Sequence, residues 1–438
     1  MAGGDRTADD GRGLGHVEAG AGLVPRAQRD VGQSGVLRDP RVVGVGQRQG
    51  CGAGHPVILP GPRPRQVPTD SAPRHVARTP ASVGSVSRTR SAVRVALTAL
   101  GVAVGAVLGL VVLVATAFSL SPWPGALLIR RAFDKGGHET NAALADRVPD
   151  DVVTRADVRY DETDPVALLD IHRPAAPGPH PTVVWVHGGG WVSGSKDQVA
   201  NYLRILAAEG FVVVAVNYSL APGARYPRPV HQVLAALRHL LAHAEDLDLD
   251  TSRLVLAGDS AGSQIAAQVA AAVTDPTYAR ALGVDPAVRS DELRAVVLHC
   301  GAYDLDLREA SSRAGAWFVE SVLWAYTGRR TPGTDPVLAL ASVLRHASAA
   351  FPPAYLSGGN ADPLTPQGRA FAERLVELGV EVVADFAEPD HEPPLGHEFQ
   401  FDLASEAGRT THEASVAFLR AHTAARPDEA GAAGTADC

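Results

Sequence analysis

The sequence predicts an α/β protein with a doubly wound, mostly parallel sheet, preceded by one apolar helix. From about residue 150, short β-branched runs alternate with amphipathic stretches, and several of these runs are apolar almost throughout. Such alternation is typical of parallel sheets that helices cover on both faces. The third observation is a segment of 24 residues without a charge at 95–118, which predicts the separate apolar helix.

Length and composition exclude several classes of protein. The chain has 438 residues, of which 45% are hydrophobic and 20% are charged, as in ordinary globular proteins. Its three cysteines, Cys51, Cys300 and Cys438, cannot build a disulfide framework or a four-cysteine zinc site. The net charge of −8 argues against a nucleic-acid-binding surface. This charge is unevenly distributed, because residues 1–94 carry +7 and the remainder carries −15.

Residues 1–94 show no helical or strand periodicity and are rich in glycine, proline and arginine. A segment of this composition cannot bury enough apolar surface to offset its conformational entropy, so we expect it to be disordered. An equally simple interpretation is that it is translated upstream sequence, with the native start near Val83 or Val86. Mass spectrometry of the native N-terminus distinguishes the two interpretations.

Residues 95–118 are predicted to form a transmembrane helix that anchors the protein in a bilayer. At 1.5 Å per residue the helix spans roughly 36 Å, enough for a hydrocarbon core of about 30 Å. Five arginines within residues 74–94 precede it, which places the N-terminus in the cytoplasm and residues 120–438 outside. The alternative is a secretory signal peptide cleaved near Ala117, although its apolar region would be unusually long.

The remaining chain divides into a linker or cap region at 122–150, a catalytic domain at 151–425 and a flexible tail at 426–438. Residues 122–150 and roughly 303–335 are expected to cover the carboxyl edge of the sheet as a helical cap. Eight strands are predicted at Ala156–Tyr160, Ala167–Ile171, Thr182–His187, Phe211–Tyr218, Arg253–Ala257, Ala295–Cys300, Ala354–Ser357 and Glu381–Phe386. Helices are predicted at Gln198–Glu209, Val230–His243, Ser263–Val273, Gln367–Leu378 and Thr411–His422.

The strongest chemical signal is a G-x-S-x-G motif between a predicted strand and a predicted helix. It consists of Gly258, Asp259, Ser260, Ala261 and Gly262. In this context the motif is a nucleophile elbow, a strained turn that exposes the serine oxygen at the end of the strand. The glycines leave room for the sharp turn, and the helix N-terminus directs amide groups at the serine. Ser260 is therefore the candidate nucleophile.

A second motif follows another apolar strand and consists of His187, Gly188, Gly189, Gly190 and Trp191. Consecutive glycines let the backbone approach a substrate and point its N–H groups inward, as an oxyanion hole requires. A phosphate-binding loop is the rival interpretation, but the Lys-Ser/Thr pair of such loops is missing. His187 is expected to hold the loop through hydrogen bonds, with no role as a base.

With both motifs intact, residues 150–425 resemble an α/β-hydrolase of the carboxylesterase/lipase type. They are most similar to the hormone-sensitive-lipase-like esterases, which combine HGGG with GDSAG. Residues 217–222 (NYSLAP) resemble the family's N-Y-R-L-A-P, with Ser219 in place of arginine. The resemblance implies an eight-stranded, mostly parallel α/β-hydrolase sheet. It also implies a serine esterase without metal or cofactor, in which Gly189, Gly190 and Ala261 form the oxyanion hole.

The order of the triad in this fold, Ser, then Asp or Glu, then His, indicates where the remaining partners lie. Asp362 occupies the loop position of the family's acid, and Asp390 is the alternative. Two histidines compete as the base. His397 matches the family's His-x-Phe pattern before the last helix, whereas His391 lies in a proline-rich loop. We expect His397 to act as the base and Asp362 to orient it.

The predicted partners are a small-molecule ester, with a short- to medium-chain acyl group, and the lipid bilayer at 95–118. The same residues would also serve an amidase, formamidase or deacetylase. A binding protein on an inactive hydrolase fold is the alternative from another class, although such proteins usually lack a triad residue. Cys300, within an apolar strand, is expected to be an inert buried thiol. No nucleic acid is expected, and the sequence does not indicate the oligomeric state.

Overall fold

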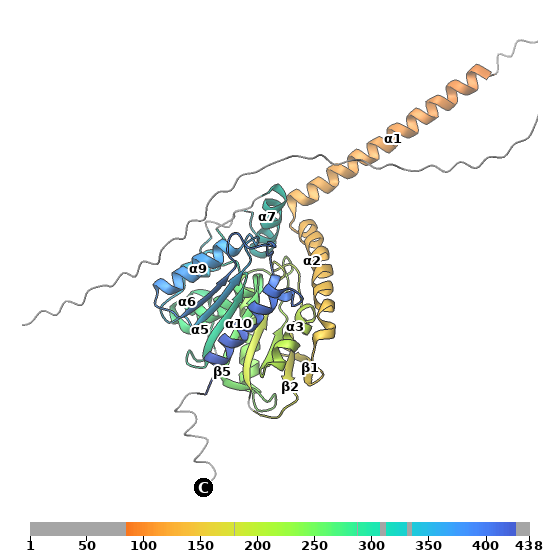
Figure 1. Cartoon of the computed structure of the whole chain (residues 1–438). Helices are drawn as coiled ribbons and strands as arrows, with labels where there is room; N and C mark the ends of the chain where they lie inside the picture. Colours follow the sequence, from red (N-terminus) through yellow and green to blue (C-terminus); the bar gives the residue numbers. More distant parts are fainter. Residues whose placement is uncertain (1–84, 179, 287, 307–311, 331–334, 426–438) are drawn as a thin grey trace, which may run out of the picture. The chain divides into compact units, whose positions relative to one another are not determined.

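The computed structural model describes residues 85–178, 180–286, 288–306, 312–330 and 335–425. Within them, eight strands form one sheet in the order β1-β2-β4-β3-β5-β6-β7-β8 (Figure 1). Strand β2 runs antiparallel to both of its neighbours, β1 and β4. All the remaining adjacent pairs, from β4 to β8, are parallel. The strands are β1 (Val152–Arg159), β2 (Leu168–Pro174), β3 (Pro181–Val186), β4 (Val212–Val216), β5 (Asp250–Asp259), β6 (Leu293–His299), β7 (Ala354–Gly358) and β8 (Val382–Phe386). The predicted eight-stranded, mostly parallel sheet is confirmed.

Helices pack on both faces of this sheet. Alternate side chains of β3 enter different cores: Val184 and Val186 face one, and Val183 and Trp185 face the other. The first core includes α4 (Arg228–Ala242), α5 (Ala261–Thr274) and α9 (Thr365–Glu377), and the second includes α3 (Lys196–Ala208) and α10 (Glu406–His422). The remaining helices are α1 (Ser85–Leu120), α2 (Trp123–Ala143), α6 (Pro276–Leu282), α7 (Arg313–Thr327) and α8 (Pro336–Ala339), with single 3₁₀ turns at Ala145–Arg147, Val343–Arg345 and Phe399–Phe401.

Each predicted strand overlaps an observed strand, and the largest difference in position is in β1. This strand begins at Val152, whereas Ala156 was the predicted start. Residues 152–155 pair with residues 171–174 of β2, beyond a register shift between Arg155 and Val158. Mostly exposed residues extend this strand because of pairing with β2, which a local hydrophobic pattern cannot reveal.

The apolar segment lies within a longer helix than the sequence predicts. Helix α1 begins at Ser85, so residues 85–94, predicted as part of a disordered leader, are helical. They contain no proline or glycine, and the helix extends through them from the apolar segment. Residues 1–84 and the predicted tail at 426–438 lie outside the described residues.

The two regions predicted to form a cap supply α2 and α7. The rings of Phe133 on α2 and Phe318 on α7 are 5.4 Å apart. At Gly125 the helices are so close that a Cβ would lie 3.2 Å from the Ser321 hydroxyl oxygen. Tyr326, near the end of α7, is fully buried against Trp191. Residues 307–311 and 331–334 of the second region lie outside the described residues.

Candidate active site

Ser260 lies at the turn between β5 and α5 and has the backbone conformation of a strained elbow. Its φ of 52° and ψ of −119° are unfavourable for a residue with a side chain, a strain that costs on the order of 1–3 kcal/mol. The turn is closed by glycines on both sides. A Cβ on Gly262 would lie 2.0 Å from the carbonyl oxygen of Val186 on β3, and one on Gly258 would lie 2.7 Å from the same atom.

His397 lies beside this serine, and Asp362 lies beside the histidine. The Nε2 atom of His397 is 2.8 Å from the Ser260 Oγ, and its Nδ1 atom is 2.9 Å from Asp362 Oδ2. The other oxygen of Asp362 accepts a hydrogen bond from the backbone N–H of Leu364 at 2.8 Å. The side chain of Asp362 is fully buried, which fixes the direction of the carboxylate. The geometry matches a nucleophile, a base and an orienting acid.

The alternative candidates from the sequence lie elsewhere. His391 is hydrogen-bonded through Nδ1 to the carbonyl oxygen of Pro393, within its own loop. Asp390 is exposed next to it. The structure therefore brings His397 and Asp362, of the four competing residues, to Ser260.

The protonation of His397 depends on its neighbours. Burial opposes protonation, but the hydrogen bond to Asp362 acts in the other direction, and the pKa of His397 lies well above 6.5. The raised pKa makes the neutral imidazole a stronger base, and that neutral form becomes populated as the pH rises through this pKa. Cys300 is buried, and burial raises the pKa of its thiol to about 11, so the thiol stays neutral near pH 7.

Cys300 is closer to the site than the sequence indicates. It follows the last residue of β6, has a φ of 44°, and lies beside His397. One potential ligand atom from each of Cys300, Asp362 and His397 lies within 4.8 Å of the others. Both nitrogens of His397 are already hydrogen-bonded to Ser260 and Asp362, so a metal ion could bind there only by disrupting that chain.

The glycine loop after β3 turns back toward the elbow. Gly189 has a φ of 102° and Gly190 a φ of 59°, conformations that favour glycine. At Gly189 a Cβ would lie 2.2 Å from the carbonyl oxygen of Ser193, so the position admits no side chain. Gly190 and Ala261 line the same pocket as Ser260. Of the three predicted oxyanion-hole residues, Gly190 and Ala261 thus line the pocket beside the serine, and Gly189 directly precedes Gly190 in the same loop.

Buried side chains hold this loop from beneath. The ring of His187 stacks on Tyr218 at 4.3 Å, and its Nδ1 is 2.9 Å from the Gly188 carbonyl oxygen. Burial lowers the pKa of His187 to about 4, so it is neutral near pH 7. The Tyr218 hydroxyl donates to the carbonyl oxygen of His187 at 3.0 Å. This contact gives a structural role to the NYSLAP stretch that contains Tyr218.

Asp259 connects the elbow to the glycine loop. Its carboxylate accepts hydrogen bonds from the Trp185 indole N–H and from the Gly188 backbone N–H, each at 2.8 Å. Glu398 is hydrogen-bonded to the same carboxyl group. Burial, followed by the charge of Glu398, raises the pKa of Asp259 well above 3.8. The Asp259 carboxyl group therefore retains its proton to a higher pH than a free aspartate does.

Glu398 is a residue of the site that no sequence pattern predicts. The residue has a φ of 61°, which is uncommon for a side chain as large as glutamate, and its Oε1 lies 3.8 Å from His397 Nε2. The only available signal was its position directly after the candidate histidine.

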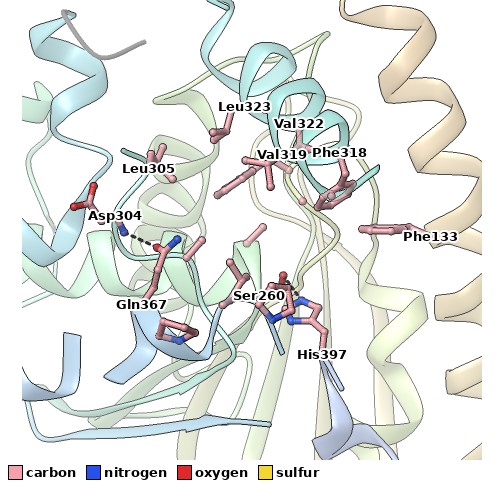
Figure 2. Close-up of a pocket in the computed structure, with 18 residues that line it drawn as sticks. Phe133, Ser260, Asp304, Leu305, Phe318, Val319, Val322, Leu323, Gln367 and His397 are labelled. Carbon is pink, nitrogen blue, oxygen red and sulfur yellow. Dashed lines mark hydrogen bonds between the residues drawn. The ribbon is translucent and has the colours of Figure 1, made fainter. Parts of the chain in front are cut away.

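An apolar pocket of about 370 Å³ opens over Ser260 and His397. Figure 2 shows side chains of α7 and Phe133 of α2 across the pocket from these two residues. Its apolar wall includes Phe133, Leu305, Phe318, Val319, Val322 and Leu323. A volume of this size fits a small organic ligand. Its polar groups include Asp304, whose backbone N–H donates to the Gln367 side chain at 2.9 Å.

The known proteins that this chain resembles in sequence include esterases and a carboxylesterase. A sequence model described as the α/β hydrolase fold matches residues 183–392. Esterase LipC of Mycobacterium tuberculosis is 31% identical over 62% of this chain and 66% of its own length. Carboxylesterase NlhH of the same species is 33% identical over 50% of this chain and 66% of its own length. The chain thus spans just under two thirds of each relative.

The similarity to a solved structure supports the fold and nothing beyond the fold. Esterase B of Lactobacillus rhamnosis superposes with a TM-score of 0.59 over 68% of this chain and 96% of its own. The two sequences are 24% identical in the superposed region.

Proposed function

The chain contains an α/β-hydrolase domain, and from this premise we propose that it is a serine hydrolase that cleaves carboxylic esters. The observation that carries the proposal is the hydrogen-bonded chain from Ser260 through His397 to Asp362, of which Ser260 and His397 line an apolar pocket. The esterase and carboxylesterase names of the two relatives support the same reaction class.

In the proposed mechanism, His397 removes the proton of Ser260 through Nε2 while the serine oxygen attacks the ester carbonyl. Asp362 holds the imidazole and stabilises the imidazolium that forms. The backbone amides of Gly189, Gly190 and Ala261 stabilise the developing oxyanion. His397 then donates its proton to the leaving alcohol. Water, deprotonated by His397, attacks the acyl-enzyme and releases the acid.

The test is turnover of p-nitrophenyl acetate and butyrate by the full chain in detergent. We expect Ser260→Ala to lower kcat by at least about 10⁴-fold, because the nucleophile and its base act as a unit. His397→Ala should have a similar effect, and His391→Ala, the matched control, should have none. Equal turnover by the parent and Ser260→Ala would exclude the proposed reaction. If His391→Ala loses activity and His397→Ala does not, the base is His391 and the assignment of His397 is wrong.

The apolar lining of the pocket favours a substrate ester with a short- to medium-chain acyl group. Its wall between α2, α7 and the elbow is lined by phenylalanine, valine and leucine side chains. Apolar acyl groups bury well against such side chains, each methylene contributing about 0.8 kcal/mol. A series of p-nitrophenyl esters from acetate to decanoate measures the preference. We expect kcat/KM to rise with chain length until the pocket is filled.

We also propose that α1 anchors the protein in a membrane with the catalytic domain outside the cytoplasm. Residues Arg90–Leu120 form a helical segment of 31 residues, whose most apolar 18-residue window has a mean hydropathy of 2.7 and is not buried. Arginines in residues 85–94 precede the apolar part. The full chain should stay with membranes after carbonate extraction. A mature protein that begins after Ala117 would instead indicate a cleaved signal.

A further inference from the structure

The described residues expose large apolar side chains in one place besides α1. Trp123, Leu127 and Leu128 on α2 are 46%, 50% and 55% exposed, and Phe133 and Trp317 are 39% and 41% exposed. We call these five residues the apolar rim. The other exposed large apolar residues outside α1 are four scattered valines: Val153, Val166, Val376 and Val383. Single exposed valines are ordinary, whereas a group of tryptophan, leucine and phenylalanine marks an interaction surface.

The rim belongs to the two helices that enclose the pocket. Helical geometry places Trp123 and Leu127, four residues apart, next to each other on α2, with Leu127 on the side opposite buried Ile129. Trp317 extends the rim onto α7, where its ring lies 3.6 Å from the Cβ position of Gly125 on α2. Phe133 belongs both to the rim and to the pocket wall. The exposed apolar surface therefore continues into the pocket above Ser260.

The rim is also tied to the end of α1. Only two residues separate Leu120, the last residue of α1, from Trp123, the first of α2. Three chain steps at about 3.6 Å each place their Cα atoms within roughly 11 Å. Beyond α7, the Arg330 guanidinium donates hydrogen bonds to the carbonyl oxygens of Phe118 at 3.2 Å and Ser119 at 2.7 Å. Both rim-bearing helices are thus fastened to the segment that leaves the proposed span.

The composition of the rim fits a lipid interface. Tryptophan is enriched where membrane proteins cross from hydrocarbon to headgroups, and Trp123 follows the span directly. Arg131 is exposed and lies four residues after Leu127, on the same face of α2. A cationic side chain beside apolar ones suits contact with both phosphate groups and acyl chains.

We propose that the apolar rim lies against the bilayer that holds α1, and that the pocket takes lipophilic esters dissolved in that bilayer. This inference rests on the proposed function, an ester hydrolase anchored by α1, and adds the substrate class and the route of entry. An ester at the headgroup level would enter past Phe133 with its acyl chain already in apolar surroundings. Ser260 would then attack a substrate that never crosses bulk water.

The test compares one chromophore in two locations, with the full chain in phosphatidylcholine vesicles. p-Nitrophenyl butyrate is supplied from water, and p-nitrophenyl decanoate is dissolved in the bilayer. The double substitution Leu127→Glu with Leu128→Glu changes two rim residues that do not line the pocket. Val376→Glu with Val383→Glu, on exposed positions of α9 and β8, is the matched control.

We expect the rim variant to keep the parent's butyrate activity. Its ratio of decanoate to butyrate kcat/KM should fall by about tenfold or more, since apolar contacts are lost and charges meet the bilayer. The control should keep the parent's ratio. An unchanged ratio in the rim variant would overturn this inference alone. Absence of butyrate activity in the parent would instead overturn the proposed function.

A second measurement is independent of catalysis. In vesicles that contain brominated phosphatidylcholine, the parent's tryptophan fluorescence should be quenched, and Trp123→Phe with Trp317→Phe should remove most of this quenching. The control is Trp185→Phe, because Trp185 is buried within the sheet core. Equal quenching in the parent and the rim-tryptophan variant would place the rim away from the bilayer.

Discussion

At the residue scale, the environment of His397 decides the protonation chemistry of the site. One side faces Asp362, whose carboxylate stabilises the imidazolium, and the other faces Ser260. Glu398 adds a second carboxyl group 3.8 Å from Nε2. Because only a neutral imidazole can take the serine proton, activity should rise with pH through the pKa of His397.

Replacing Asp362 with asparagine tests this dependence. Asp362→Asn should lower kcat by about 10⁴-fold, because the imidazolium loses its partner and the tautomer is no longer held. The acid limb of the remaining activity should move to lower pH, since Asp362 raises the pKa of His397. The pH profile of p-nitrophenyl butyrate hydrolysis measures both effects. Asp390→Asn is the control, and a similar loss there would indicate that Asp390 is the acid.

Replacing Glu398 with glutamine tests the buried carboxyl pair. The pKa of Asp259 is higher in the folded protein than the 3.8 of a free aspartate, so the folded state binds more protons than the unfolded state. Folding stability should therefore fall as pH rises from about 4 through the folded-state pKa. Glu398→Gln removes the charge that contributes to this shift and lowers the pKa of Asp259.

The measurement for Glu398→Gln is the thermal unfolding temperature between pH 4 and pH 8. The variant should gain stability relative to the parent as the pH rises, with the smallest difference at pH 4. Exposed Glu388→Gln should show no such trend. A difference between Glu398→Gln and the parent that is constant with pH would contradict the proposed coupling.

At the element scale, close approach between β3 and the start of α5 sets the position of Ser260, the proposed nucleophile. Gly262 allows this approach, because a Cβ there would lie 2.0 Å from one backbone carbonyl oxygen and 2.6 Å from the next, those of Val186 and His187. Helix α5 could admit a side chain only by moving away from the sheet. Ser260, the residue before α5, would move with it.

Gly262→Ala should destabilise the fold by about 3 kcal/mol or more, at the upper end of overpacking costs, because the contact is with backbone. Chemical denaturation of the full chain in detergent measures it. Gly136→Ala is the matched control, since Gly136 is helical and a Cβ there would meet nothing within 4 Å. That control should gain about 0.5–1 kcal/mol from helix propensity. A tolerated Gly262→Ala would show that the elbow can relax.

Lys196 anchors the start of α3 to the edge of the sheet. Its ammonium lies 2.9 Å from Asp157, 3.0 Å from Asp170 and 3.0 Å from Asp197, and the side chains of Lys196 and Asp170 are 5% and 7% exposed. Asp157, with a φ of 56°, lies at the register shift of β1. One cation therefore joins a helix to two strands.

Lys196→Met should cost about 3–5 kcal/mol, because Asp170 would be left buried without its cation. The chain offers a close control in Lys135, its only other lysine, which forms an exposed pair with Glu139 at 3.6 Å. Lys135→Met should change the free energy of unfolding by about 0.5 kcal/mol or less. Similar costs for both variants would contradict the anchoring role of Lys196.

At the scale of the whole molecule, α2 belongs to the catalytic domain although it follows α1 directly. Arg130 donates hydrogen bonds to the carbonyl oxygens of Val192 at 2.6 Å and Ala221 at 2.9 Å. Near the other end of α2, the backbone N–H of Asn201 donates to the Asn141 side chain at 2.8 Å. These bonds fix α2 to α3 and to the loops after β3 and β4, independently of α1.

A deletion series follows from this arrangement. Residues 122–438 should fold and hydrolyse p-nitrophenyl butyrate with a kcat/KM like that of the full chain, because α2 and its contacts are retained. Residues 145–438 should lose most activity, because Phe133 and the contacts of Arg130 are removed with α2. Full activity of the shorter chain would show that α2 does not form part of the pocket.

The sequence by itself determined the local parts of this protein. These parts are the elbow around Ser260, the glycine loop at 188–190 and the strand–helix alternation. Each depends on residues that are adjacent in the sequence, because neighbouring glycines permit the turns and apolar runs form the buried strands. The choice of Asp362 and His397 needed a family resemblance as well. Neither residue is within 100 positions of Ser260, and nothing local to either specifies the other.

The tertiary structure alone decided which distant groups meet. The order of the strands brings the ends of β5, β6, β7 and β8 together, so Cys300 after β6 and Glu398 after β8 join the site, although no spacing in the sequence predicts it. The same applies to α2 and α7, whose apolar side chains divide between the pocket and the rim. Local patterns report what a segment can form, whereas proximity depends on how the whole sheet is ordered and covered.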